Sequence, residues 1–143
     1  MRTFDEVLGE LDRLTTSGAR QQGAWSFPWV LEHCAQSIEY SLTGYPVLRS
    51  GLFRATVGRI AKGKFLRSGA MSHDIEALIA GAPALSLSDA NHAADRLRQA
   101  IAAFRAWEGS LAPHLAYGSC TKGDYEALHA MHVTDHFSKL RPS

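Results

Sequence analysis

Helix caps placed directly before segments of helical periodicity restrict the fold of this chain more than any other feature. Thr3 and the glutamate three residues later form a capping-box pattern. Apolar residues then recur at helical spacing, so a first helix is predicted over about 4–16. Ser26 can cap a second helix that runs to about Thr43. This helix has Pro28 in its first turn, where the missing N–H of proline is tolerated.

The same signals predict two more helices in the second half of the chain. Ser88 can cap a third helix over about 89–108, whose apolar stripe is rich in alanine. Thr121, with Asp124 three residues later, forms a variant capping box for a last helix that ends at about Leu140. The chain therefore contains four amphipathic segments of helical length.

The segment between the second and third helices carries weaker signals. Residues 48–60 are weakly helical and glycines interrupt any longer period, so a long crossover with one or two short helices is expected over 47–87. The polar stretch 19–23 is expected to be a loop, and no segment alternates as a strand does. The sequence predicts an all-α fold, an antiparallel four-helix bundle with a long crossover between the second and third long helices, as a single domain over 1–143.

The composition excludes some partners and cellular locations for such a bundle. The 143 residues include 15 basic and 14 acidic ones, a formal charge of +1 without the basic footprint of a nucleic-acid-binding protein. Cys34 and Cys120 belong to no CxxC pattern and are expected to be reduced. No apolar run approaches the roughly 18 residues of a membrane span and no signal-peptide pattern is present. A cytoplasmic protein without membrane or nucleic-acid partners is therefore expected.

The last predicted helix carries a stripe of histidines. His132 and His136 stand four residues apart, so both imidazoles lie on one helix face about 6 Å apart along the axis and can converge on one ion. His33 lies on the apolar stripe of the second helix, and an antiparallel arrangement of the two helices would place it level with the pair. These three residues are the predicted metal ligands, an arrangement that leaves a fourth position open for catalysis.

Further residues are candidates for proton transfer. Tyr125 and His129 continue the stripe and are candidate general acids or bases. His129 lies about 10 Å along the axis from His136, so it is expected to line a pocket rather than to bind the ion. Glu32 and Asp135 adjoin the predicted ligands in sequence, but solvent-facing charge explains both more simply.

Simpler explanations also exist for the other polar residues. An HxxxH pair is often exposed, and a lone histidine on an apolar face is usually a hydrogen-bonded core residue. His73, His92 and His114 are expected in loops or at exposed positions. The basic residues from Arg49 to Arg67 are explained by solvated surface charge, although they could attract an anionic substrate.

The sequence resembles the metalloenzymes of the DinB/YfiT-like superfamily, in a bacterial branch. The matching blocks, about a third of the chain, are Trp25 to Tyr40 with Gly44-Tyr45-Pro46, and Tyr117-Gly118 with Asp124 to His129, His132 and His136. The helix-two histidine, the Gly-Tyr-Pro stop and the terminal HxxxH follow one another in the order and spacing of that superfamily.

The resemblance implies a four-helix bundle, often a homodimer, that holds a divalent metal, zinc or nickel, on His33, His132 and His136. Characterised members include transferases and isomerases that use low-molecular-weight thiols. The function expected here is that of a metal-dependent hydrolase or thiol-dependent transferase acting on a small molecule, because a three-histidine ion can activate either water or a thiol. The alternative is a non-catalytic bundle for metal binding, ligand binding or dimerisation, with its histidines satisfied internally.

Overall fold

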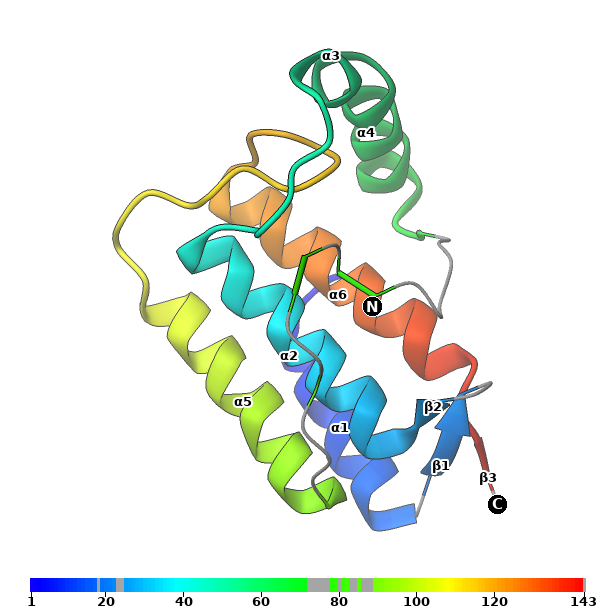
Figure 1. Cartoon of the computed structure of the whole chain (residues 1–143). Helices are drawn as coiled ribbons and strands as arrows, with labels where there is room; N and C mark the ends of the chain where they lie inside the picture. Colours follow the sequence, from blue (N-terminus) through cyan, green and yellow to red (C-terminus); the bar gives the residue numbers. More distant parts are fainter. Residues whose placement is uncertain are drawn as a thin grey trace.

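Long helices that share one hydrophobic core form the body of the structure (Figure 1). The computed structural model describes residues 1–17, 19–22, 25–71, 78–79, 81–82, 85 and 89–142, and this part of the chain is mostly helical. The longest helices in it are α1 (Phe4–Ser17), α2 (Phe27–Thr43), α5 (Ala90–Ala106) and α6 (Lys122–Ser138). None of the described helices is long and apolar enough to cross a membrane.

Two capping boxes begin helices where the sequence predicts them. The N–H of Glu6 donates to Thr3 Oγ1 at 3.3 Å, and the N–H of Thr3 donates to Glu6 Oε1 at 3.2 Å. The same reciprocal pair joins Thr121 and Asp124 at the start of α6. Each box satisfies backbone donors that the first helical turn leaves without partners.

The other two long helices begin at single caps. Ser26 caps α2 by accepting from the N–H of Trp29 at 3.4 Å, as predicted. The cap of α5 is Asp89, which accepts from the N–H of His92 at 2.8 Å, and not Ser88, which lies outside the described residues. Aspartate and serine cap equally well, so the sequence alone did not distinguish these adjacent positions.

The long helices run in two directions (Figure 1). α2 and α5 run the same way, and α1 and α6 run the opposite way. Ion pairs agree with this arrangement, because Asp5 and Asp12 of α1 meet Arg105 and Arg98 of α5 in reversed order, each at 2.8 Å. The predicted crossover between α2 and α5 allows α5 to start at the same end of the structure as α2.

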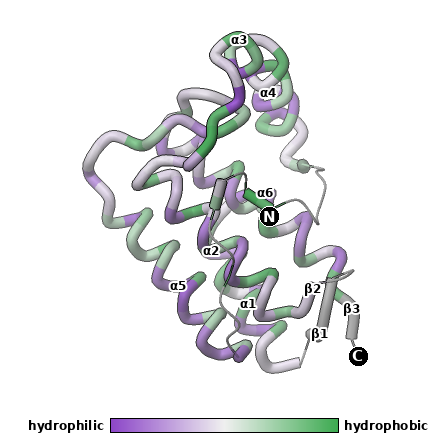
Figure 2. Tube along the Cα trace, in the orientation of Figure 1, coloured by the Kyte–Doolittle hydropathy of each residue, from purple (hydrophilic) through white to green (hydrophobic). Residues whose placement is uncertain are grey.

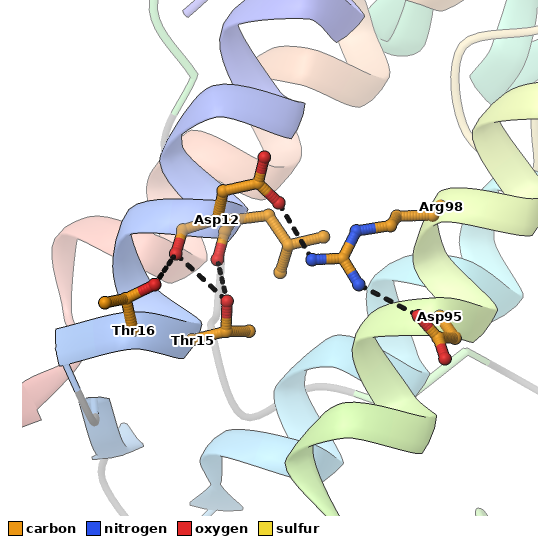
Figure 3. A network of polar contacts seen from close by, with 6 residues as sticks. Asp12, Thr15, Thr16, Asp95 and Arg98 are labelled. Atoms are coloured by element: carbon orange, nitrogen blue, oxygen red, sulfur yellow. Dashed lines mark hydrogen bonds and ion pairs between the residues drawn. The ribbon is translucent and has the colours of Figure 1, made fainter.

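Polar contacts join α5 to both of its neighbours. Arg98 reaches Asp12 of α1 and Asp95 of its own helix (Figure 3). On the other side, Arg96 pairs with Glu32 and, at 2.6 Å, with Glu39 of α2. The pair with Glu32 is the more sheltered, and the exposed pair with Asp12 contributes little to stability.

The crossover contains one continuous helical segment made of α3 (Gly51–Phe53), the π-helical turn η1 (Arg54–Gly58) and α4 (Arg59–Ser68). This agrees with the prediction of one or two short helices within 47–87. The segment lies against the loop before α6, where a Cβ atom on Gly58 would stand 1.7 Å from the carbonyl oxygen of Ala116. The close approach therefore requires glycine at this position.

A small sheet was missed by the sequence prediction. β1 (Ala19–Gln22) lies in the stretch expected to be a loop, and it pairs antiparallel with β2 (Trp25–Ser26) and with β3 (Arg141–Pro142). Strands this short have no apolar alternation to detect, and β3 is distant in sequence. The sheet joins the start of α2 to the end of α6 (Figure 1).

The core is made of apolar stripes on the long helices. Bands of hydrophobic and hydrophilic residues alternate along α5 in Figure 2, and its buried residues follow the predicted stripe. Alanines at positions 93, 94 and 100 are buried, which lets α2 and α5 pack closely. Leu97 lies in the same stripe and is 0% exposed.

We expect Leu97→Ala to lower the free energy of unfolding by about 2–5 kcal/mol, because it removes buried methylene groups and leaves a cavity. Leu52→Ala is the matched control, since Leu52 is 76% exposed, and should change it by less than about 0.5 kcal/mol. Urea unfolding followed by circular dichroism measures both. Equal effects would contradict the assigned core.

Candidate metal centre

Three histidines meet where α2 packs against the end of α6. His33 lies in the second turn of α2, and His132 and His136 lie on successive turns of α6. The two helices are antiparallel, so the beginning of α2 faces the end of α6 (Figure 1). His33 is 3% exposed, His136 is 0% exposed and His132 is partly buried. We call these three residues the histidine cluster.

The cluster has the dimensions of a metal site. One ligand nitrogen from each imidazole can be chosen so that all three lie within 4.8 Å of one another. Three nitrogens bound to a tetrahedral ion at about 2.0–2.1 Å lie about 3.4 Å apart, so small side-chain rotations suffice to close the site. Three neutral imidazoles suit zinc, nickel and related divalent ions. The cluster could therefore hold a metal ion.

Trp25 of β2 covers the cluster. Its ring stacks on His136 at a centroid distance of 5.8 Å and an interplanar angle of 13°, and meets His33 at 5.1 Å and 63°. The strand that the prediction missed is what places this indole against two predicted ligands, where it restricts the orientation of their rings.

A cavity of about 350 Å³ adjoins the cluster. His33 and His132 form part of its wall, whereas His136 is not among its described lining residues. The remaining polar lining comes from Ser37, Arg49, His114, Tyr117 and His129, and the apolar lining from Met71, Leu78, Ile79, Leu115, Ala116 and Leu128. An ion held by the cluster would therefore face this cavity, which we call the main cavity.

The two candidate acid–base residues of α6 have different surroundings. The hydroxyl of Tyr125 donates to the carbonyl of Ala112 at 2.5 Å, and burial raises the pKa of this hydroxyl. Tyr125 therefore holds the loop before α6 in place and is not suited to proton transfer. His129 lines the main cavity, as expected, but burial lowers its pKa to about 3. Its Nε2 is buried with no hydrogen-bond partner in the described part of the chain. His129 is thus a neutral wall residue at pH 7.

His114 lies in a loop, as expected, but it is partly buried rather than exposed. It lines the main cavity and stacks on Tyr117 at a centroid distance of 4.3 Å. Its Nδ1 accepts from the N–H groups of Ala116 and Tyr117 at 3.0 and 3.2 Å. Burial lowers its pKa to about 4, so the ring is neutral and carries its proton on Nε2. Its place in an irregular loop concealed this role.

The remaining predicted residues are placed as follows. His92 is exposed and pairs with Asp89, as expected for a surface residue, and His73 lies outside the described residues. Glu32 and Asp135 are both buried, so the simpler explanation of solvent-facing charge is wrong for them. Glu32 is held by Arg96 of α5.

The low pKa values of His129 and His114 predict a loss of stability in acid. The unfolded chain takes up a proton on each near pH 6.5, whereas the folded chain resists protonation down to about pH 3 and 4. Stability should therefore fall as the pH falls below about 6.5. Between pH 7 and pH 5 the free energy of unfolding should fall by roughly 1–2 kcal/mol less in His129→Phe than in wild type, because the variant lacks this imidazole.

Urea unfolding at both pH values, with chelator present, measures this difference. His92→Phe is the matched control, because the Asp89 carboxylate raises the pKa of the exposed His92 and its removal should not reduce the acid sensitivity. Parallel pH curves for wild type and His129→Phe would show that His129 is not a buried neutral imidazole.

Comparison with known proteins gives a family but no described activity. No curated protein and no solved structure was found to be similar to the chain. The family described as "Protein of unknown function (DUF1569)" matches residues 1–143, which include every member of the histidine cluster. The chain therefore belongs to the DUF1569 family.

Proposed function

We propose that the chain is a metal-dependent enzyme of the DinB/YfiT-like kind, a four-helix bundle that uses zinc or nickel on His33, His132 and His136. The observation that carries this proposal is the position of the cluster. Its three ligands could hold an ion, and two of them form part of the wall of a cavity of about 350 Å³. Three protein ligands beside a cavity leave one coordination position open, as catalytic sites do, whereas structural zinc sites are closed by four.

Such an ion supplies a nucleophile at neutral pH by lowering the pKa of a bound water towards about 7, or by binding a thiol as thiolate. The chain contributes binding and orientation. His33 and His132 would hold the ion at the wall of the main cavity, Trp25 restricts two of the imidazoles, and the apolar wall would exclude water from a bound small molecule. The reaction proposed is hydrolysis or transfer to a low-molecular-weight thiol, in a cytoplasmic homodimer.

Elemental analysis of untagged protein purified without chelator tests the metal. We expect about one divalent ion per chain, and fewer than about 0.1 after His33→Ala, His132→Ala or His136→Ala, because two imidazoles without a third bind an ion weakly. His129→Phe on the same helix and His92→Ala on the surface are controls that should keep the ion. Wild type with fewer than about 0.1 ion per chain would contradict the proposal.

The reaction type is tested on the same samples. Small electrophiles are incubated with metal-loaded protein, in buffer alone and with a low-molecular-weight thiol, and products are identified by mass spectrometry. Turnover that is lost in His132→Ala but kept in His92→Ala supports an enzyme. A full complement of metal without turnover of any substrate would favour the non-catalytic bundle.

A further inference from the structure

The main cavity contains a cationic donor, Arg49, and an imidazole N–H donor, His114. Arg49 is the one permanently charged residue among the described lining residues, and no aspartate or glutamate is among them. His114 carries its proton on Nε2, because its Nδ1 already accepts from two backbone N–H groups. A divalent ion at the cluster would add further positive charge. A guanidinium and an imidazole N–H favour ligands that carry acceptor oxygens and negative charge.

Arg49 is anchored to the cavity wall. Its N–H donates to the carbonyl of Leu115 at 2.8 Å, which ties the start of the crossover to the loop before α6. Its guanidinium lies over the ring of Phe53, 4.7 Å from the centroid. A planar guanidinium held in this way suits a carboxylate, which it can bind through two parallel hydrogen bonds. Arg49 itself is exposed, so it borders the cavity on its solvent side.

The neighbouring surface is also cationic. A second hollow of about 430 Å³ adjoins the main cavity at Tyr117, which lines both. Arg54, Arg59 and Lys62 line it, again without an acidic residue among its described lining. Lys62 is partly engaged, by the carbonyl of Ser119 at 3.0 Å and by Asp124 at 3.8 Å. The surroundings of the cavity would therefore attract an anion and repel a cation.

The rest of the cavity wall is apolar. Leu78, Ile79, Leu115 and Leu128 offer hydrocarbon surface, and Ile79 and Leu128 are buried. A phosphate-rich ligand would find a single guanidinium and much apolar wall there, whereas a ligand with one carboxylate and a hydrocarbon body would satisfy both.

We infer that the main cavity binds a small organic carboxylate, whose anionic group pairs with Arg49 and whose hydrocarbon body packs on the leucine and isoleucine wall. The inference rests on the proposed function in one respect, that this cavity is the substrate site. It assigns the substrate class of that site, and it makes Arg49 a residue that determines substrate specificity.

The test compares hexanoate with 1-hexanol, which share a hydrocarbon chain and differ in charge. Binding to the full-length protein is followed by NMR chemical-shift titration at physiological ionic strength. We expect hexanoate to bind about tenfold more tightly than hexanol, and this preference to fall below about threefold in Arg49→Gln. Arg13→Gln is the matched control. Arg13 lies on α1, pairs with Glu10 and lines neither hollow, so the same change there should keep the preference.

The metal content of each sample separates this inference from the proposed function. Suppose that the protein takes up no metal but still binds hexanoate more tightly than Arg49→Gln does. This result would support the carboxylate site and contradict the proposal of a metalloenzyme. A preference for hexanoate that persists unchanged in Arg49→Gln would place the carboxylate on the ion or elsewhere and overturn the inference. Absence of hexanoate binding up to about 50 mM would overturn it as well.

Discussion

The antiparallel contact between α2 and α6 is the constraint on which the rest of the site depends. A chain of hydrogen bonds sets its register at the end remote from the cluster. Tyr125 donates to the carbonyl of Ala112, and the N–H of Ala112 donates to the carbonyl of Ser41. With one end of α2 fixed against the start of α6, His33 comes level with His132 and His136, because helical rise is constant.

Much of the helical framework could be predicted from sequence because the signals are local. Each helix cap accepts a hydrogen bond from a backbone N–H only three residues later, as seen at Thr3, Ser26 and Thr121. The apolar stripes indicate directly which helix face is buried. The meeting of His33 with His132 and His136 could also be proposed, since it follows from helix direction and position along each helix. These inferences need only the geometry of regular helices.

The parts that could not be predicted depend on irregular or distant contacts. β1 and β3 pair although more than a hundred residues separate them, and neither is long enough to alternate. Arg49 lies in the crossover and His114 lies in the loop before α6. In such irregular segments no periodicity indicates which way a side chain points. Both line one cavity, and beside them the N–H of Arg49 donates to the carbonyl of Leu115, a contact with no sequence signature.

The groups that surround the main cavity come from different helices, strands and loops. The predicted ligands come from α2 and α6, the indole that packs on them comes from β2, and the cations come from the crossover and its helix. The buried residues of the core cluster all come from the four long helices, and no described residue of the crossover belongs to it. A change in the crossover can therefore alter what the cavity recognises without disturbing the three imidazoles.

The contact at Gly58 has a mechanical consequence. Backbone touches backbone there, without an intervening side chain that could rotate or compress. The helical segment with the cations and the loop with His114 are thereby held in direct contact. A larger residue at position 58 would push the helical segment away from this loop and change the shape of the second hollow, which both of them line.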